Sequence, residues 1–245
     1  MHLLTKIIAH RGSLAYTPNN TLSAFRLAVK LGADGIELDV QKTKDDVLIV
    51  CHDQVIDKVT NCTGHISNFT WKELCGLSLK NGSGELSLND RIPTLQEVLA
   101  SLPPSYFLNV ELKTAPYPYP GIEKQVIQEI AQYGRHLDIV VSSFNHRSLL
   151  EVQKVNRSCR TGILYEGGFI RIWDYVRGIG LSAHSLHPYI NHVDRQFVSS
   201  AHSYGYAVYV YLANTQEEII RMLDAGVDGI ITDDVVLAKR LRDGH

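Results

Sequence analysis

Apolar, β-branched runs alternate with longer amphipathic segments along almost the whole chain. Short apolar runs bounded by turn residues are typical of buried strands, and apolar residues at spacings of three and four indicate helices. The pattern predicts eight strands, which we place at Leu4–Ala9, Gly35–Gln41, Tyr106–Leu112, Asp138–Ser143, Thr161–Tyr165, Leu181–Leu186, Ala207–Leu212 and Gly229–Thr232.

Helical patterns fill the intervals between these strands. Capping boxes at Thr70–Glu73 and Thr94–Glu97 predict two further helix starts. The glycine-rich segment 167–180 has the weakest helical pattern. Eight strands with crossover helices predict an α/β fold with a parallel sheet, and eight is the number that closes a (β/α)8 TIM barrel. The clearest helices are expected at Thr21–Leu31, Gly121–Tyr133, Arg147–Val155, Arg195–Tyr204 and Gln216–Ala225.

One polar interval, at about residues 53–92, breaks this alternation between the second and third strands. It is too long for an ordinary barrel loop, which has a handful of residues. We interpret residues 1–245 as a single barrel domain and this interval as a small insertion on the rim, forming a lid or a substrate wall.

Composition and charge exclude several classes of protein. With 24 Lys and Arg against 26 Asp and Glu, the chain lacks the basic excess that holds nucleic acid. No apolar run approaches the roughly 20 residues that span a bilayer, so no integral membrane segment is expected. The N-terminus shows no export signal, which favours a cytoplasmic protein. The four cysteines lie far apart without zinc-type spacing, so we expect reduced structural thiols.

Chemically active residues gather where the predicted strands end, which is where barrel enzymes place their functional groups. His10-Arg11-Gly12 ends the first strand, and a hairpin-like continuation of the second delivers His52. Glu37 and Asp39, two residues apart on the second strand, leave the same face. The same spacing recurs at Glu111 and Lys113 on the third strand.

Buried carboxylates on adjacent strands need a cation or several basic partners. Three oxygen ligands without cysteine suit Mg²⁺ or Ca²⁺ better than zinc. Arg11 and Lys113 suit an anionic substrate, since arginine can grip phosphate oxygens with two parallel hydrogen bonds. The two histidines offer one base and one acid. Together these groups predict phosphodiester cleavage.

The sequence resembles the glycerophosphodiester phosphodiesterase family. That resemblance implies a TIM barrel with an insertion after the second strand, a divalent metal, and release of sn-glycerol 3-phosphate plus an alcohol. It makes His10 and His52 the acid/base pair, Glu37, Asp39 and Glu111 the metal ligands, and Arg11 and Lys113 the residues facing phosphate. The matching motifs are residues 10–12, 18–25, 32–40, 44–46, 52–53, 92–95, 110–113 and 228–233.

Two positions depart from the family pattern. The usual Pro-Glu-Asn-Thr segment has Asn19 in place of Glu, which removes one charge near the site entrance. The usual Trp-Thr-Val-Asn after the seventh strand is Tyr-Leu-Ala-Asn here, in which Tyr211 is expected to wall the substrate pocket.

Two other functions stay open at this point. A lysophospholipase D-like enzyme acting on lipid phosphodiesters would need an apolar groove or a membrane-facing surface. The insertion offers four apolar residues for such a surface, but they are better explained as the inner face of its short helix: Phe69, Trp71, Leu74 and Leu77. A non-catalytic phosphate-ligand binding protein could share the scaffold. The sequence also leaves open which head-group alcohol is released, which histidine is the acid, and the oligomeric state.

Overall fold

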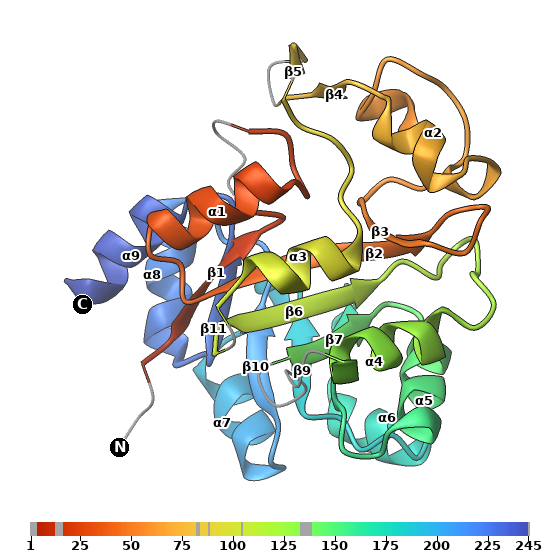
Figure 1. Cartoon of the computed structure of the whole chain (residues 1–245). Coiled ribbons are helices and arrows are strands. Elements are labelled where there is room, and N and C mark those ends of the chain that lie inside the picture. The colour runs from red at the N-terminus through yellow and green to blue at the C-terminus, as the bar shows by residue number, and fades with distance from the viewer. Residues whose placement is uncertain are drawn as a thin grey trace.

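Eight parallel strands close into a barrel in the computed structural model (Figure 1), which describes residues 4–12, 17–81, 84–87, 89–103, 105–132 and 139–244. Each strand pairs with the next in the order given below, and the last pairs with the first. The predicted TIM barrel is therefore confirmed. Its strands are β1 (Lys6–His10), β2 (Gly35–Lys42), β6 (Phe107–Leu112), β7 (Ile139–Ser143), β8 (Arg160–Tyr165), β9 (Ser185–Pro188), β10 (Ala207–Val210) and β11 (Gly229–Thr232).

Helices surround the barrel on its outer side (Figure 1). Each buries an apolar face against the strands, and the two predicted capping boxes are present at the N-termini of α2 and α3. The glycine-rich segment holds only the short helix α6, as its weak pattern suggested, and α9 is a helix that the sequence pattern had not indicated. The barrel helices are α1 (Leu22–Lys30), α3 (Leu95–Ser101), α4 (Ile122–Gln132), α5 (His146–Val155), α6 (Ile172–Gly178), α7 (Arg195–Ser203), α8 (Gln216–Ala225) and α9 (Val235–Asp243), with the 3-10 turn η3 (Ile190–His192).

Several strand boundaries differ from the expectation by two or more residues, including those of the sixth and seventh barrel strands. The sixth barrel strand begins at Ser185 and not at Leu181, because the Leu181 N–H bonds to the Val176 carbonyl at 3.2 Å in the turn that ends α6. The seventh ends at Val210, and the residue after it makes only an isolated bridge. The expected element ends Tyr133 and Asp138 lie outside the described residues.

The rim insertion follows the antiparallel strand β3 (Leu48–Val50), which pairs with β2. It packs around a small apolar cluster of its own, built on Ile49 and Cys51 and completed by Ile56, Ile66, Leu74, Leu79 and Ile92. Leu74 is buried there and Phe69, Trp71 and Leu77 pack against the cluster, as the sequence suggested. The elements of the insertion are η1 (Ile56–Lys58), η2 (Ile66–Asn68), α2 (Trp71–Cys75), β4 (Leu79–Lys80) and β5 (Leu86–Ser87).

Two further sequence expectations concern thiols and membrane spans. All four cysteines are free thiols, as expected. Among the described residues, no helix combines the length and the apolar character needed to cross a membrane.

Candidate active site

The register of β1, β2 and β6 brings three carboxylates together. His10 at the end of β1 is the register partner of Glu37 on β2. Two residues further along β2, Asp39 is the partner of Glu111 on β6. Because residues two apart on a strand share a face, the three acidic side chains converge, and one oxygen of each lies within 4.8 Å of the others.

Burial and crowding set the charge state of this acidic triad. Glu37, Asp39 and Glu111 are 4%, 0% and 8% exposed. Burial, followed by the charges of the other two carboxylates, raises the pKa of Glu37 well above its ordinary value. Burial and Asp39 likewise raise the pKa of Glu111, against the effect of Lys113. Burial also acts to raise the pKa of Asp39, but Arg11 and Lys113 outweigh it and lower that pKa.

The triad fits a divalent metal ion. Its donors are all carboxylate oxygens, the ligands that Mg²⁺ and Ca²⁺ prefer. The Oδ1 atom of Asp39 is buried and accepts no hydrogen bond from the described residues, as expected of an atom reserved for a cation. No other set of three acidic, histidine or cysteine side chains in the described part of the chain lies this close.

Two basic side chains lie against the triad. The Nε atom of Arg11 is 3.3 Å from Oδ2 of Asp39. The Nζ atom of Lys113 is 2.8 Å from Oε1 of Glu111 and 3.6 Å from Oδ1 of Asp39. An anion that approached the triad would therefore meet both cations, which is the arrangement expected for a phosphate contact.

The turn after β1 explains the His10-Arg11-Gly12 sequence. Arg11 has a φ of 54°, and its N–H donates to the Glu37 carbonyl at 2.9 Å and to its carboxylate at 3.2 Å. Gly12 has a φ of 96°, and a Cβ there would lie 2.6 Å from Cβ of Ala24 on α1. Glycine is required because the turn is left-handed and the helix packs directly against it.

His10 is held from both sides. Its Nδ1 atom lies 2.7 Å from Oδ1 of Asp233, which follows β11, and its Nε2 atom is 3.9 Å from Oε2 of Glu37. Asp233 is itself fixed by the Asn214 amide, which donates to its Oδ2 at 2.6 Å. Burial lowers the pKa of His10, although the hydrogen bond to Asp233 opposes this. The imidazole therefore has a fixed orientation next to the triad.

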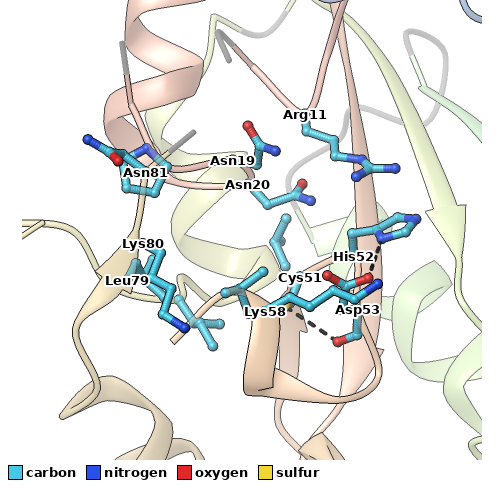
Figure 2. Close-up of a pocket in the computed structure, with 14 residues that line it drawn as sticks. Arg11, Asn19, Asn20, Cys51, His52, Asp53, Lys58, Leu79, Lys80 and Asn81 are labelled. Carbon is cyan, nitrogen blue, oxygen red and sulfur yellow. Dashed lines mark hydrogen bonds and ion pairs between the residues drawn. The ribbon is translucent and has the colours of Figure 1, made fainter. Parts of the chain in front are cut away.

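His52 lies on the insertion side, where it lines a pocket of about 200 Å³ (Figure 2). Its Nδ1 atom is 2.9 Å from Oδ1 of Asp53. When protonated, His52 helps to lower the pKa of Asp39, so its charge acts on the triad. Arg11 and Asn20 line the same pocket, and both contact Asp39, so the pocket is connected to the triad through these two side chains.

Tyr211 stands on the opposite side of the barrel mouth, after β10. Its hydroxyl donates to the Tyr165 carbonyl at 3.0 Å, and its ring packs edge-on against Phe144, with the ring centroids 5.9 Å apart. Burial, then Glu166 and Glu111, raises the pKa of Tyr211. The ring is thus placed near the triad with its hydroxyl already hydrogen-bonded. This arrangement suits a side chain that walls the substrate pocket and not one that donates a proton in the reaction.

Sequence reasoning gave no role to Asn20 or Asp233, although both lie within the quoted motifs. Asn20 is 3% exposed, and its amide donates to Oδ2 of Asp39 at 2.9 Å. The signal for Asp233 was an acidic residue at the end of the last strand, which pairs with the first. Barrel closure places it beside His10.

Comparison with known proteins agrees with this geometry. The model of the glycerophosphoryl diester phosphodiesterase family matches residues 10–237. A glycerophosphodiester phosphodiesterase of Caldanaerobacter subterraneus is 41% identical over 231 residues, covering 94% of each chain. One from Bacillus altitudinis is 36% identical over 249 residues, covering 98% of this chain and 99% of the relative.

Solved structures of phosphodiesterases share the fold of this chain. An Oleispira antarctica phosphodiesterase, in complex with the product sn-glycerol-3-phosphate, superimposes with a TM-score of 0.86 at 25% identity, covering 98% of this chain and 97% of the other. A putative glycerophosphoryl diester phosphodiesterase from Silicibacter pomeroyi shares the fold, with a TM-score of 0.85 at 23% identity over 98% and 94% of the two chains.

Fold and site together define a TIM-barrel enzyme of the phosphoric diester hydrolase class. The chain belongs to the glycerophosphoryl diester phosphodiesterase family.

Proposed function

We propose that this chain hydrolyses glycerophosphodiesters to sn-glycerol 3-phosphate and an alcohol, with Mg²⁺ or Ca²⁺ as its cofactor. The observation that carries the proposal is the buried acidic triad with Arg11 and Lys113 beside it, at one end of a barrel of this family. The product held by the Oleispira relative supports the identity of the released phosphate ester.

Glu37, Asp39 and Glu111 would hold the metal ion, which when bound polarises a phosphoryl oxygen. In our proposal Arg11 and Lys113 bind the remaining phosphate oxygens. Their ion pairs with the triad keep them in place before substrate arrives, so little side-chain entropy is lost on binding.

His10 and His52 are the proposed acid/base pair. His10 contacts Glu37 and is oriented by Asp233, so we assign it to deprotonate the attacking hydroxyl. Attack by water gives sn-glycerol 3-phosphate directly, whereas attack by the 2-hydroxyl of the substrate glycerol gives a cyclic phosphate that a water molecule must then open. His52 lines the pocket outside the triad, so we assign it to protonate the departing alcohol. The alcohol needs that proton because an alkoxide is a poor leaving group.

Residues 1–245 act as one domain in this proposal. The rim insertion forms one wall of the substrate pocket through residues of η1 and β4. Tyr211 forms part of the wall across the mouth, where its ring lies beside Phe144 and Tyr189.

One observation favours lysophospholipid hydrolysis as a second candidate function. The loop after β8 carries Phe169, 43% exposed, and Ile170, 92% exposed, and Phe144 after β7 is 40% exposed. Exposed apolar side chains on the same barrel face as the site are a feature that a lipid substrate could use. The buried triad and both histidines argue against a protein that only binds phosphate.

Turnover of glycerophosphocholine against lysophosphatidylcholine micelles separates the two functions. We expect the water-soluble diester to give the higher kcat/KM, with glycerol 3-phosphate as product. Ile170→Ser is the matched variant, because removing an exposed isoleucine should affect only the micellar substrate. Higher activity on micelles, lost in Ile170→Ser, would replace the first proposal with the second.

A further inference from the structure

The pocket beside His52 is lined by two lysines, Lys58 and Lys80, that the proposed reaction does not use. Among its charged lining residues are Arg11, Lys58 and Lys80 on the basic side, and Asp53 alone on the acidic side. Asp53 is already engaged by His52 at 2.9 Å. Within the described part of the chain, neither Lys58 nor Lys80 forms an ion pair with a carboxylate.

The two lysines are placed by the packed insertion and not by a loose loop. Lys58 ends η1, and Lys80 lies on β4. The N–H of Lys80 donates to the Val59 carbonyl at 2.9 Å, which joins the two elements directly. The Lys80 ammonium donates to the Asp57 carbonyl at 3.1 Å. Both elements rest on the insertion's apolar cluster through Ile56 and Leu79.

Lys58 faces the catalytic side of the pocket. Figure 2 shows its side chain extending toward Asp53 and His52. Its charge also reaches that carboxylate, because the pKa of Asp53 is lowered first by the hydrogen bond with His52 and further by Lys58. A group bound between Lys58 and His52 would therefore lie next to the histidine that we assign to the leaving alcohol.

Asn19 adds no charge to the wall of this pocket. It lines the pocket opposite the insertion, at the position where the family pattern has Glu. Its Oδ1 atom is buried and accepts no hydrogen bond from the described residues. A neutral side chain at this position leaves the two lysine charges without a carboxylate facing them from this wall.

We infer that this pocket is the leaving-group subsite and that it selects glycerophosphodiesters whose departing alcohol carries an anionic group, a carboxylate or a phosphate monoester. The inference rests on the proposed function and adds the substrate class. The pocket volume of about 200 Å³ suits a small polar alcohol. Cationic head groups such as choline would place like charges together.

Four diesters of glycerol 3-phosphate with matched leaving alcohols test the inference. The alcohols are ethanolamine, glycerol, glycerate and glycerol phosphate, which are cationic, neutral, a carboxylate and a phosphate monoester. For wild type we expect kcat/KM for either anionic alcohol to exceed that for neutral glycerol by about threefold to tenfold, the range of a partly solvated ion pair. The effect should lie in KM and shrink as salt rises, because exposed charges are screened over about 10 Å at 0.1 M.

Lys58→Met and Lys80→Met should each reduce this preference and leave the ethanolamine and glycerol diesters nearly unchanged. Asn19→Glu should reduce it further by restoring a negative charge. Lys72→Met is the control, because Lys72 is exposed on α2 and does not line the pocket. Thermal unfolding of each variant identifies any that fails to fold, and the other lysine variant then decides the test.

Two kinds of result would contradict the inference, and they can be told apart. Equal turnover of all four diesters, or an equal loss on all four in Lys58→Met, would overturn the inference while leaving the proposed function standing. Absence of turnover on every diester with added metal would overturn the proposed function, and this inference with it.

Discussion

The Nδ1 atom of His10 lies 2.7 Å from Oδ1 of Asp233, across the seam where the first and last barrel strands pair. The two residues are separated by almost the whole chain and meet only because the barrel closes. Asp233 accepts from the Nδ1 side and so leaves Nε2 facing Glu37 at 3.9 Å. Barrel closure therefore sets the orientation of a proposed catalytic group.

Asp233→Asn should lower kcat by about 10²-fold with little change in KM, because the variant no longer fixes the protonated Nδ1 of His10. Steady-state kinetics on one diester measures this split, and the unfolding temperature should stay close to that of wild type. Asp174→Asn, which changes an exposed carboxylate on α6, is the control. Unchanged kcat in Asp233→Asn would show that His10 needs no such partner.

Alanine at either histidine should cost at least about 10²-fold in turnover, as for one lost proton-transfer group. The two losses should combine to less than their product, since both groups act on one transition state. A diester with a leaving group of low pKa needs no acid, so it should rescue His52→Ala and not His10→Ala. Rescue of His10→Ala alone would reverse the assignment of the two roles.

Glu37→Gln should stabilise the metal-free protein at neutral pH. Burial and the neighbouring carboxylates raise the pKa of Glu37, so between its ordinary and its raised value the folded state binds more protons than the unfolded chain does. Stability is therefore full below the ordinary value near 4.5 and falls as the pH rises through the raised pKa. Unfolding temperatures in chelator, measured across pH, should show this decline in wild type and a smaller one in the variant.

The same variant should lose metal affinity. Calorimetry should show weaker Mg²⁺ or Ca²⁺ binding, and metal should raise the unfolding temperature of wild type more than that of Glu37→Gln. Unchanged affinity would remove Glu37 from the ligand set.

The role of the Asn20 amide and the role of its backbone conformation can be tested separately. Its amide donates to Asp39, and its φ is 57°. Asn20→Ala and Asn20→Gly should both weaken metal binding by about 10-fold, the size typical of a lost partner of a metal ligand. Asn20→Ala should in addition be about 1 kcal/mol less stable than Asn20→Gly, because alanine resists the left-handed conformation. Equal stability of the two variants would argue against backbone strain at this position.

The sequence was most informative where a local pattern decides the structure. Short apolar, β-branched runs predicted all eight barrel strands, and the boundaries of Gln216–Ala225 and Gly229–Thr232 match those observed. The start of β9 was misplaced because Leu181 belongs to the turn that ends α6. A sequence pattern cannot distinguish an apolar residue in such a turn from one in a strand.

Contacts made by barrel closure and by the insertion could not be predicted in this way. The His10–Asp233 pair joins residues near the two ends of the chain, and an irregular segment brings Lys58 into the pocket that His52 also lines. The spacing of the acidic residues on β2 and β6 did predict which carboxylates converge, because the barrel fold makes these two strands neighbours. The cytoplasmic location and the absence of a nucleic-acid partner stay predictions.

The central claim is tested most directly by assaying metal-stripped wild-type protein on a glycerophosphodiester, with an enzyme-coupled readout specific for sn-glycerol 3-phosphate. We predict no product in chelator and full turnover on adding Mg²⁺ or Ca²⁺, with Glu111→Gln remaining low at the same metal concentration. Turnover that persists in chelator, or that fails with every divalent ion, would contradict the account.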